Sequence, residues 1–127
     1  MSEIGMDIVN VDRIRRSFQR YGDGFLEKIL TRDEIALCRN KADMLQSVAS
    51  RFAAKEAISK AFGCGICGDF TWHSVEILNE PGGKPYVKKT EKMRCHPEAS
   101  IKISLSHDRQ YAAAVALVEF EEKSCVP

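Results

Sequence analysis

The pattern of hydrophobic and polar residues in the first part of the chain predicts one strand followed by a helix. An apolar run over 4–9, interrupted by Asp7, predicts the strand. A helical pattern then extends to the glycine-containing break at 22–24, and the sequence offers Asn10 or Asp12 as its N-cap. The chain therefore enters the fold on a strand and turns directly into a helix.

Two further short helical signals follow the break. F-L-E-K-I-L at 25–30 predicts a short helix. T-R-D-E at 31–34 matches a capping box, in which Thr31 caps the next helix and the Glu34 side chain reaches back to the cap.

The longest predicted helix covers about 43–62, with Asp43 as its N-cap and Gly63 as its C-terminal stop. At about 100° per residue, its apolar side chains fall on one arc that should face the core. These residues are Ala54, Ala57, Ile58, Ala61 and Phe62.

Four charged residues of this helix lie off that arc or near its edge. Glu56 and Lys60 are one turn apart, and Arg51 and Lys55 form a second row near the edge. One interpretation is a solvated flank with a surface ion pair, which contributes only about a few tenths of a kcal/mol. The alternative is a functional site that includes charged groups from other parts of the chain.

The second part of the chain is patterned for strands. W-H-S-V-E-I-L at 72–78 alternates in part, P-G-G at 81–83 is a turn, and K-P-Y-V-K at 84–88 begins a partner strand. I-K-I-S-L-S at 101–106 alternates cleanly, whereas Y-A-A-A-V-A-L-V at 111–118 is apolar on both faces. Such a strand is central in its sheet or covered by another subunit. The order of strand, helices and antiparallel meander makes the fold class α+β.

Length and composition narrow the classes of function. The 127 residues suit one domain, which we place at 1–120 with a C-terminal tail at 121–127. A formal net charge of +1 provides no global field that would attract nucleic acid. The sequence shows neither an apolar run of membrane-spanning length nor a secretory signal, so we expect a soluble, cytoplasmic protein.

The cysteines favour packing over metal or redox chemistry. Five scattered cysteines, an odd number, argue against a secreted disulfide framework. Cys64 and Cys67 have C-x-x-C spacing, but a zinc site would need a second pair at similar spacing, and Cys95 followed by His96 is a poor substitute. Small apolar filler is the better interpretation for most of them.

Three positions outside the long helix point to a phosphorylated substrate. Asp7 in an otherwise apolar strand needs a partner or a cation, unless it caps the following helix. His107 beside Ser106 could bind an anion, although a lone histidine there is usually structural. Lys84 follows two glycines that let a ligand approach the backbone, in what is otherwise a hairpin turn. Two carboxylates and several cations suit Mg²⁺ bound to substrate phosphates.

Five stretches of the chain form a recognisable series. They are G-M-D-I-V at 5–9, I-L-T-R-D-E at 29–34, R-F-A-A-K-E-A-I-S-K-A-F-G at 51–63, the segment from Trp72 to G-G-K-P at 82–85, and S-L-S-H at 104–107. Together they resemble the small bacterial holo-acyl-carrier-protein synthases, which are phosphopantetheinyl transferases. The resemblance implies a magnesium-dependent transfer of the phosphopantetheine arm of coenzyme A to a serine of apo-acyl carrier protein, with release of adenosine 3',5'-bisphosphate.

The resemblance also implies roles for individual residues. Asp7 and Glu56 would be the metal ligands, and Lys60 would stabilise charge on the diphosphate or protonate the leaving group. Glu56, or a water that it orients, would be the base for the serine. The residues that contact coenzyme A would be Arg51, Lys60, Gly63, Lys84, Pro85, Ser106 and His107.

The predicted partners follow from the same resemblance. The carrier protein of this family is acidic, so Arg13 and Arg20 of the basic first helix would dock it, with Phe18 and Phe25 as apolar anchors. A solvated helix face is the alternative for any single arginine. The family is trimeric with active sites at subunit boundaries, so we expect a homotrimer and neither nucleic acid nor membrane as a partner.

Two other functions stay open at this point. A metal-dependent phosphohydrolase acting on a nucleotide diphosphate would use the same two carboxylates to activate water. A non-catalytic coenzyme A-binding domain would bind the nucleotide without turnover.

Overall fold

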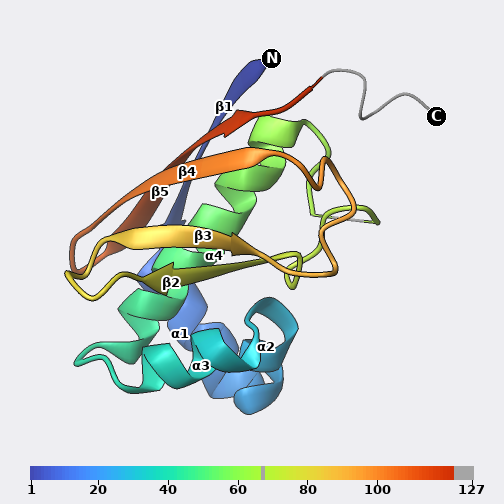
Figure 1. The fold of residues 1–127 in the computed structure, drawn as a ribbon. Helices are drawn as coiled ribbons and strands as arrows, with labels where there is room; N and C mark the ends of the chain where they lie inside the picture. The colour runs from blue at the N-terminus through green and yellow to red at the C-terminus, as the bar shows by residue number, and fades with distance from the viewer. Residues whose placement is uncertain (67, 122–127) are drawn as a thin grey trace.

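The computed structural model describes residues 1–66 and 68–121. These residues form an α+β fold, as predicted, in which one long helix packs beside a small antiparallel sheet (Figure 1). The elements in chain order are β1 (Ser2–Asn10), α1 (Val11–Tyr21), α2 (Asp23–Ile29), α3 (Arg32–Arg39), α4 (Met44–Phe62), β2 (Val75–Asn79), β3 (Pro85–Lys89), β4 (Ser100–His107) and β5 (Tyr111–Glu119).

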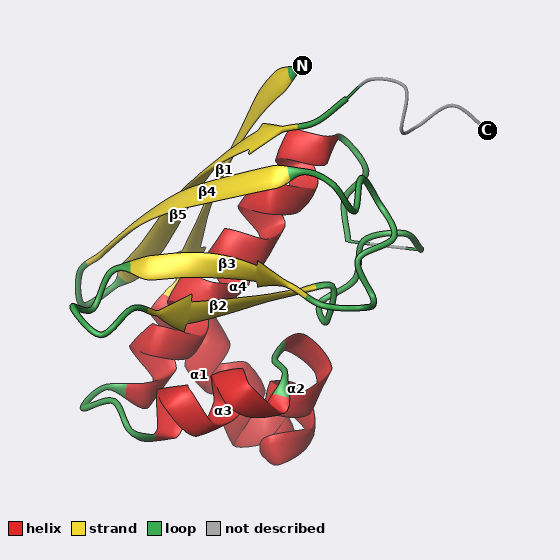
Figure 2. Cartoon of the chain, viewed as in Figure 1, coloured by secondary structure: helices red, strands yellow, loops and turns green. Residues whose placement is uncertain are grey.

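The sheet brings the first and last strands of the fold together. Its order is β1-β5-β4 with antiparallel pairing throughout, and β2 and β3 form a separate hairpin beside β4. The apolar strand β5 is therefore central, which was one of the two predicted positions for it. Helices α1, α2 and α3 gather at the end of the molecule where α4 begins (Figure 1). The connections from α4 to β2 and from β3 to β4 lie together on one side (Figure 2).

Local capping sets the helix ends as the sequence indicated. The Asn10 side chain accepts a hydrogen bond from the Asp12 N–H, so Asn10 is the cap of α1. The capping box of α3 is complete, because the Glu34 carboxylate accepts from the Thr31 N–H at 2.9 Å. Helix α4 ends at Gly63, whose φ of 79° lies in the left-handed region that favours glycine.

A close approach of β1 to α4 depends on Gly5. A Cβ at this position would lie 2.0 Å from the Ala57 carbonyl oxygen and 2.7 Å from the Ala61 nitrogen. Because side chains alternate along a strand, Gly5, Asp7 and Val9 all face the helix. The missing side chain of Gly5 thus lets α4 approach the strand that carries Asp7.

The core lies between α4 and the strands, and it includes most of the predicted apolar arc. Ala54, Ala57, Ile58 and Ala61 are buried, and Phe62 is half-buried against the same core. Residues Ala112, Ala114, Ala116 and Val118 of β5 cover the other side of this layer. Small side chains on both elements are what permit the close packing of helix on sheet.

Several predicted boundaries were wrong. Residues 72–74 precede β2 and form a turn, because the Ser74 side chain accepts from the Thr71 N–H. The break at 22–24 is shorter than predicted, since α2 already begins at Asp23. His107 belongs to β4, so the following turn starts later than expected. The predicted tail at 121–127 lies outside the described residues except for Glu121.

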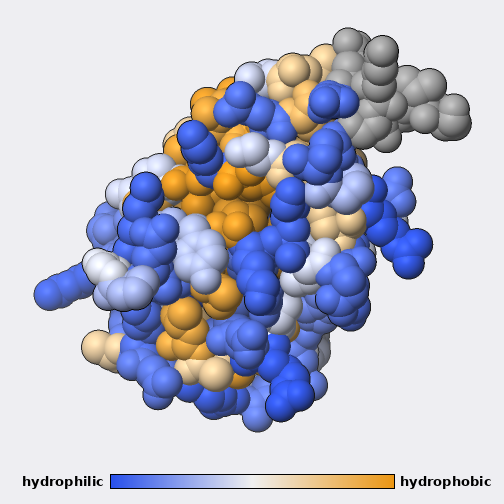
Figure 3. Space-filling view, viewed as in Figure 1, coloured by the Kyte–Doolittle hydropathy of each residue, from blue (hydrophilic) through white to orange (hydrophobic). Residues whose placement is uncertain are grey.

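The face of the sheet that points away from α4 is apolar and exposed. Ile4, Met6 and Ile8 of β1 are each more than 60% exposed, and Leu117 of β5 is 40% exposed. Val115 of β5 pairs with Met6 on the same face. On the side viewed in Figure 3, hydrophobic residues also reach the surface over the region of β4 and β5. Such a patch is unusual on a monomer and typical of a protein interface.

Candidate active site

Helix α4 carries charged residues on two opposite sides. Arg51 and Lys60 are nine residues apart, which at 100° per residue places them about 180° apart around the helix axis. Lys60 lies on the β1 side of the helix, while Arg51 lies on the side of the β2–β3 hairpin. The two sides of the helix therefore have different surroundings.

On the β1 side, the structure brings together Asp7, Glu56 and Lys60. The Lys60 Nζ donates to Asp7 Oδ1 at 3.0 Å and to the Met6 carbonyl oxygen at 3.1 Å. The Asp7 side chain is only 16% exposed, whereas that of Lys60 is 54% exposed. Residues 53 positions apart in the chain therefore form one polar cluster that opens to solvent. A role for Asp7 as a helix cap is excluded, because Asn10 caps α1.

The electrostatics tie Glu56 to the same cluster. Partial burial raises the pKa of Glu56 above its ordinary value, and the neighbouring Asp7 carboxylate raises it further. The cations Lys60 and Arg13 act in the opposite direction and lower this pKa. Two carboxylates that oppose each other's ionisation form a place where an added cation would be stabilised.

The donor set of this cluster suits a hard divalent cation with an incomplete protein shell. Among the residues described, no three His, Cys, Asp or Glu side chains group as a metal site. Two carboxylates alone match Mg²⁺, which keeps several waters and takes further oxygens from a phosphorylated substrate. Asp7 and Glu56 could hold such an ion, and Lys60 beside them could neutralise phosphate charge.

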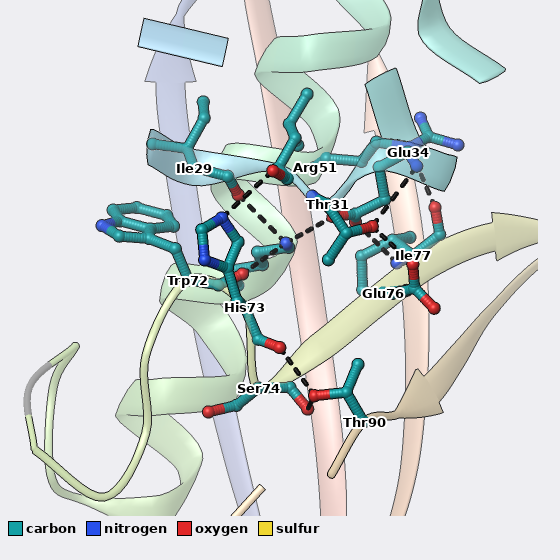
Figure 4. Close-up of polar contacts among 12 residues, drawn as sticks. Ile29, Thr31, Glu34, Arg51, Trp72, His73, Ser74, Glu76, Ile77 and Thr90 are labelled. Carbon is teal, nitrogen blue, oxygen red and sulfur yellow. Dashed lines mark hydrogen bonds and ion pairs between the residues drawn. The ribbon is translucent and has the colours of Figure 1, made fainter. Parts of the chain in front are cut away.

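The other side of α4 differs from the prediction of a solvated flank. Lys55 is fully buried and forms an ion pair with Glu34 of α3, with 2.6 Å between Nζ and Oε1. Its Nζ also donates to the carbonyl oxygens of Ile29 and Trp72, and the three labelled partners are drawn together in Figure 4. The pattern contained a signal for this, because Lys55 is only about 20° from Phe62 around the helix and thus lies directly at the edge of the apolar arc.

Arg51 is also buried, and its guanidinium makes four hydrogen bonds. It donates to the Ile77 carbonyl oxygen, to the Asn79 side chain, and twice to Ser47. The bonds to Ile77 and Asn79 tie α4 to β2, and Figure 4 includes both Arg51 and Ile77. They give Arg51 a structural role within the chain, alongside the predicted contact with coenzyme A.

The remaining predicted coenzyme A residues divide between the two sides of α4. Gly63 follows Lys60 at the end of the helix, beside a hollow of about 390 Å³ that both residues line. Ser106 and His107 end β4, where the Gln46 side chain of α4 donates to the Asp108 carbonyl oxygen. Lys84 and Pro85 follow the turn of the β2–β3 hairpin. A single chain thus brings together Asp7, Glu56, Lys60 and Gly63, and leaves Arg51, Lys84 and Pro85 on the hairpin side and Ser106 and His107 near the start of α4.

Of the predicted docking residues, Arg13 lies next to the carboxylate cluster. The Arg13 guanidinium lies 5.6 Å from the ring centre of Phe52 and is close enough to lower the pKa of Glu56. Arg20 is exposed near the end of α1, 5.3 Å from the ring centre of Tyr21. Phe18 and Phe25 are half-buried against the core, so each exposes part of its ring.

Other surface features lie away from these carboxylates. A larger groove of about 1210 Å³ runs between α2, α3 and the hairpin, and none of Asp7, Glu56 and Lys60 lines it. Cys64 is exposed and Cys38 is buried, while Cys67 lies outside the described residues. Within 1–66 and 68–121, no helix has both the length and the apolar character needed to cross a bilayer.

Comparison with known proteins identifies the family. The model of the 4'-phosphopantetheinyl transferase superfamily matches residues 3–116. A holo-[acyl-carrier-protein] synthase from Chlorobium chlorochromatii is 50% identical over 117 residues, which cover 92% of this chain and 99% of the relative. The synthase from Chlorobaculum tepidum is 51% identical over 119 residues, which cover 92% and 97% of the two chains.

Solved structures agree with the sequence matches. The Helicobacter pylori holo-[acyl-carrier-protein] synthase in complex with coenzyme A has a TM-score of 0.82 and 35% identity, covering 91% of this chain and 99% of the other. The Neisseria meningitidis synthase has a TM-score of 0.86 and 31% identity, with coverage of 92% and 97%. The chain therefore belongs to the 4'-phosphopantetheinyl transferase superfamily, and within it to the holo-[acyl-carrier-protein] synthases, which are enzymes.

Proposed function

We propose that this protein catalyses the magnesium-dependent transfer of the phosphopantetheine arm of coenzyme A to a serine of apo-acyl carrier protein. The products are holo-acyl carrier protein and adenosine 3',5'-bisphosphate. The observation that carries the proposal is the cluster of Asp7, Glu56 and Lys60, which two distant segments form at the surface. The coenzyme A complex of the Helicobacter pylori synthase supports the choice of donor substrate.

Asp7 and Glu56 are the proposed ligands of Mg²⁺. When bound, the ion would neutralise charge on the diphosphate of coenzyme A. The fit rests on the proximity of the two carboxylates: partial burial raises the pKa of Glu56, and the charge of Asp7 raises it further. The small number of protein ligands leaves space for water and for phosphate oxygens.

The chain's own residues supply the proton transfers. The serine oxygen forms a bond to the phosphorus that carries the pantetheine arm, and the bond from that phosphorus to the bridging oxygen breaks. Glu56, or a water that it orients, takes the serine proton. Lys60 stabilises the leaving phosphate or gives it a proton. Transfer of this kind depends mainly on positioning and charge neutralisation.

The coenzyme A site is proposed to lie between two subunits of a homotrimer. Lys60 and Gly63 of one subunit would contact the diphosphate, and the candidates that lie away from Lys60 would serve the neighbouring subunit's site. These are Arg51, Lys84, Pro85, Ser106 and His107. Two observations support this division: within one chain these candidates lie on the hairpin side or near the start of α4, away from Lys60, and the outer face around Met6 is apolar and exposed.

Light scattering after size-exclusion chromatography tests the assembly. We expect a mass three times the 14.3 kDa of one chain, and a smaller species for Met6→Glu. Lys102→Glu on the peripheral strand β4 is the matched control, because it also changes an exposed position on this face but lies at its polar edge. A monomer with full transferase activity would contradict the shared site.

The carrier protein is proposed to dock on α1 and the start of α2. Arg13 and Arg20 supply positive charge for an acidic partner, and Phe18 and Phe25 supply apolar contact. Arg13 also lies near Glu56, so the docked serine would arrive close to the carboxylates. The scattered, odd number of cysteines argues against a secreted disulfide framework and supports a cytoplasmic location.

Mass spectrometry of the products tests the reaction. The protein is incubated with coenzyme A, Mg²⁺ and apo-acyl carrier protein, and we expect the carrier to gain one phosphopantetheine. A carrier protein in which the acceptor serine is replaced by alanine is the control. Cleavage of coenzyme A with no gain in carrier mass would indicate a phosphohydrolase, and binding without either product would indicate a non-catalytic domain.

A further inference from the structure

The Lys55–Glu34 pair joins the helix that carries Glu56 to four other segments. All three donors of the Lys55 ammonium are used, by Glu34, by the Trp72 carbonyl oxygen at 2.6 Å, and by the Ile29 carbonyl oxygen at 3.0 Å. The Glu34 carboxylate in turn accepts from the Thr31 N–H and, at 2.7 Å, from the N–H of Ile77 in β2. The pair thus contacts α2, the cap of α3, the loop before β2, and β2 itself (Figure 4).

The geometry connects this pair to both substrates of the proposed reaction. Lys55 directly precedes Glu56, so an anchor at Lys55 fixes the rotation of α4 and with it the direction of the Glu56 side chain. Ile29 ends α2, and its carbonyl oxygen is among those that the helix itself leaves without a partner. Phe25, a proposed carrier anchor, lies one turn earlier on the same helix.

Stability alone does not account for a pair of this kind. Both side chains are 0% exposed, and the cost of desolvating two charges often equals or exceeds their mutual attraction. Apolar residues of similar volume commonly serve a core at least as well, whereas hydrogen-bonded charges accept only one arrangement of their partners. The pair is therefore better suited to holding a defined geometry than to adding stability.

We propose that Lys55 and Glu34 are positioning residues, which hold the carrier-docking helix α2 at a fixed distance from Glu56 on α4. The inference rests on the proposed function, because it takes Glu56 as the group that meets the serine and Phe25 as a carrier contact. Neither residue of the pair touches the reacting atoms in this arrangement, since both are enclosed by the protein. Their loss misplaces the carrier serine and leaves coenzyme A binding unchanged.

The test replaces the pair by neutral residues of similar shape, in Lys55→Met/Glu34→Gln. We expect kcat at saturating carrier protein and coenzyme A to fall at least tenfold, while the Kd for coenzyme A, measured by calorimetry, stays within twofold. All rates are taken well below the unfolding temperature of each variant. A folded double variant whose kcat stays within twofold of the parent would overturn the proposal.

A matched control is available on the surface. Arg39 and Asp23 also join α3 to α2 by an ion pair, with 2.7 Å between Nη2 and Oδ1, but both side chains are largely exposed. Arg39→Met breaks this pair without changing Asp23, which lies at the start of the proposed docking helix α2, and it should leave kcat within twofold. An equal loss in this control would show that any weakening of the α2–α3 contact lowers the rate, and it would overturn the special role of the buried pair.

A double-mutant cycle with Phe25→Ala separates positioning from general loosening. If the pair acts through α2, Phe25→Ala lowers kcat by a smaller factor in the Lys55→Met/Glu34→Gln background than in the parent. Equal factors in the two backgrounds would overturn the link to docking. Should the double variant fail to fold, the kcat of Glu34→Gln alone, which changes one atom, decides by the same criterion. Failure of the proposed function itself is distinguishable, because the parent protein would then transfer no phosphopantetheine.

Discussion

The two charged sides of α4 show how one helix can carry charges for different purposes. On the hairpin side, Lys55 and Arg51 are buried, and the hydrogen bonds they donate are all to groups of the protein itself. On the β1 side, Glu56 and Lys60 are partly open to solvent. Burial and the neighbouring Asp7 carboxylate both disfavour the ionised form of Glu56 and so raise its pKa. The first arrangement stabilises a geometry, whereas the second leaves electrostatic capacity for a ligand.

The largest expected effect comes from the open side. Glu56→Gln keeps the shape of the side chain and removes its charge, so it should lower the transfer rate by about 10³-fold through loss of a proposed base and metal ligand. Single-turnover measurement by mass spectrometry gives this rate, and circular dichroism checks the fold. Glu27→Gln, an exposed carboxylate on α2, is the control. Near-normal transfer in Glu56→Gln would remove both proposed roles.

The second largest effect is expected when β1 is forced away from α4. Gly5→Ala inserts a methyl group 2.0 Å from the Ala57 carbonyl oxygen, so β1 and α4 must separate. We expect the free energy of unfolding to fall by about 2–4 kcal/mol, since the clash is with backbone and cannot relax by a side-chain rotation. Chemical denaturation measures it.

The matched control for this change is Gly24→Ala, because nothing lies within 4 Å of a Cβ at that position and its φ is not left-handed. A loss of stability as large in Gly24→Ala would mean that close approach is not the reason for glycine at position 5. The transfer rate of folded Gly5→Ala should also fall, since Asp7 moves with β1 away from Lys60.

More could be predicted from the sequence about the solvent-exposed side of α4, which carries Glu56 and Lys60, than about the buried side, which carries Arg51 and Lys55. Asp7 stood out because it interrupts an apolar strand, and Glu56 and Lys60 because they share one face of a helix. Their meeting depends on the pairing of β1 with β5 and on Gly5, which are long-range features that residue patterns do not contain. The resemblance to a family supplied that link.

The buried side was harder to predict for a physical reason. Lysine and glutamate are rarely fully buried, so propensity places Lys55 at the surface even though its helical angle lies at the edge of the apolar arc. Glu34 was recognised for its capping box, which accounts for only one of the hydrogen bonds that its carboxylate makes. Its partner Lys55 lies 21 residues further along, and local patterns cannot reveal that the two side chains share one enclosed space.

A smaller effect is expected where the open side meets the carrier protein. Arg13→Ala should raise the KM for the acidic carrier about tenfold and leave the KM for coenzyme A nearly unchanged, because a partly exposed charge contributes mainly to encounter and orientation. Steady-state rates at varied carrier concentration measure this. Arg94→Ala is the control, since Arg94 is exposed and lies outside α1. Equal changes in both KM values would remove the docking role of Arg13.

The smallest effect concerns stability as a function of pH, and its sign separates the two sides of the helix. Burial and Asp7 raise the pKa of Glu56 in the folded protein, so folding favours the protonated form. The stabilisation from this group is complete below the ordinary pKa of glutamate and is lost as the pH rises through the higher pKa of the folded state.

In the presence of EDTA, Glu56→Gln should therefore unfold at a slightly higher temperature than the parent at pH 7.5, and the difference should disappear near pH 4. Adding Mg²⁺ at pH 7.5 should reduce or reverse the difference, because only the parent retains both carboxylates. A parent that is more stable than Glu56→Gln at pH 7.5 without metal would show that Glu56 is a structural charge like Glu34, and the contrast between the two sides of α4 would fail.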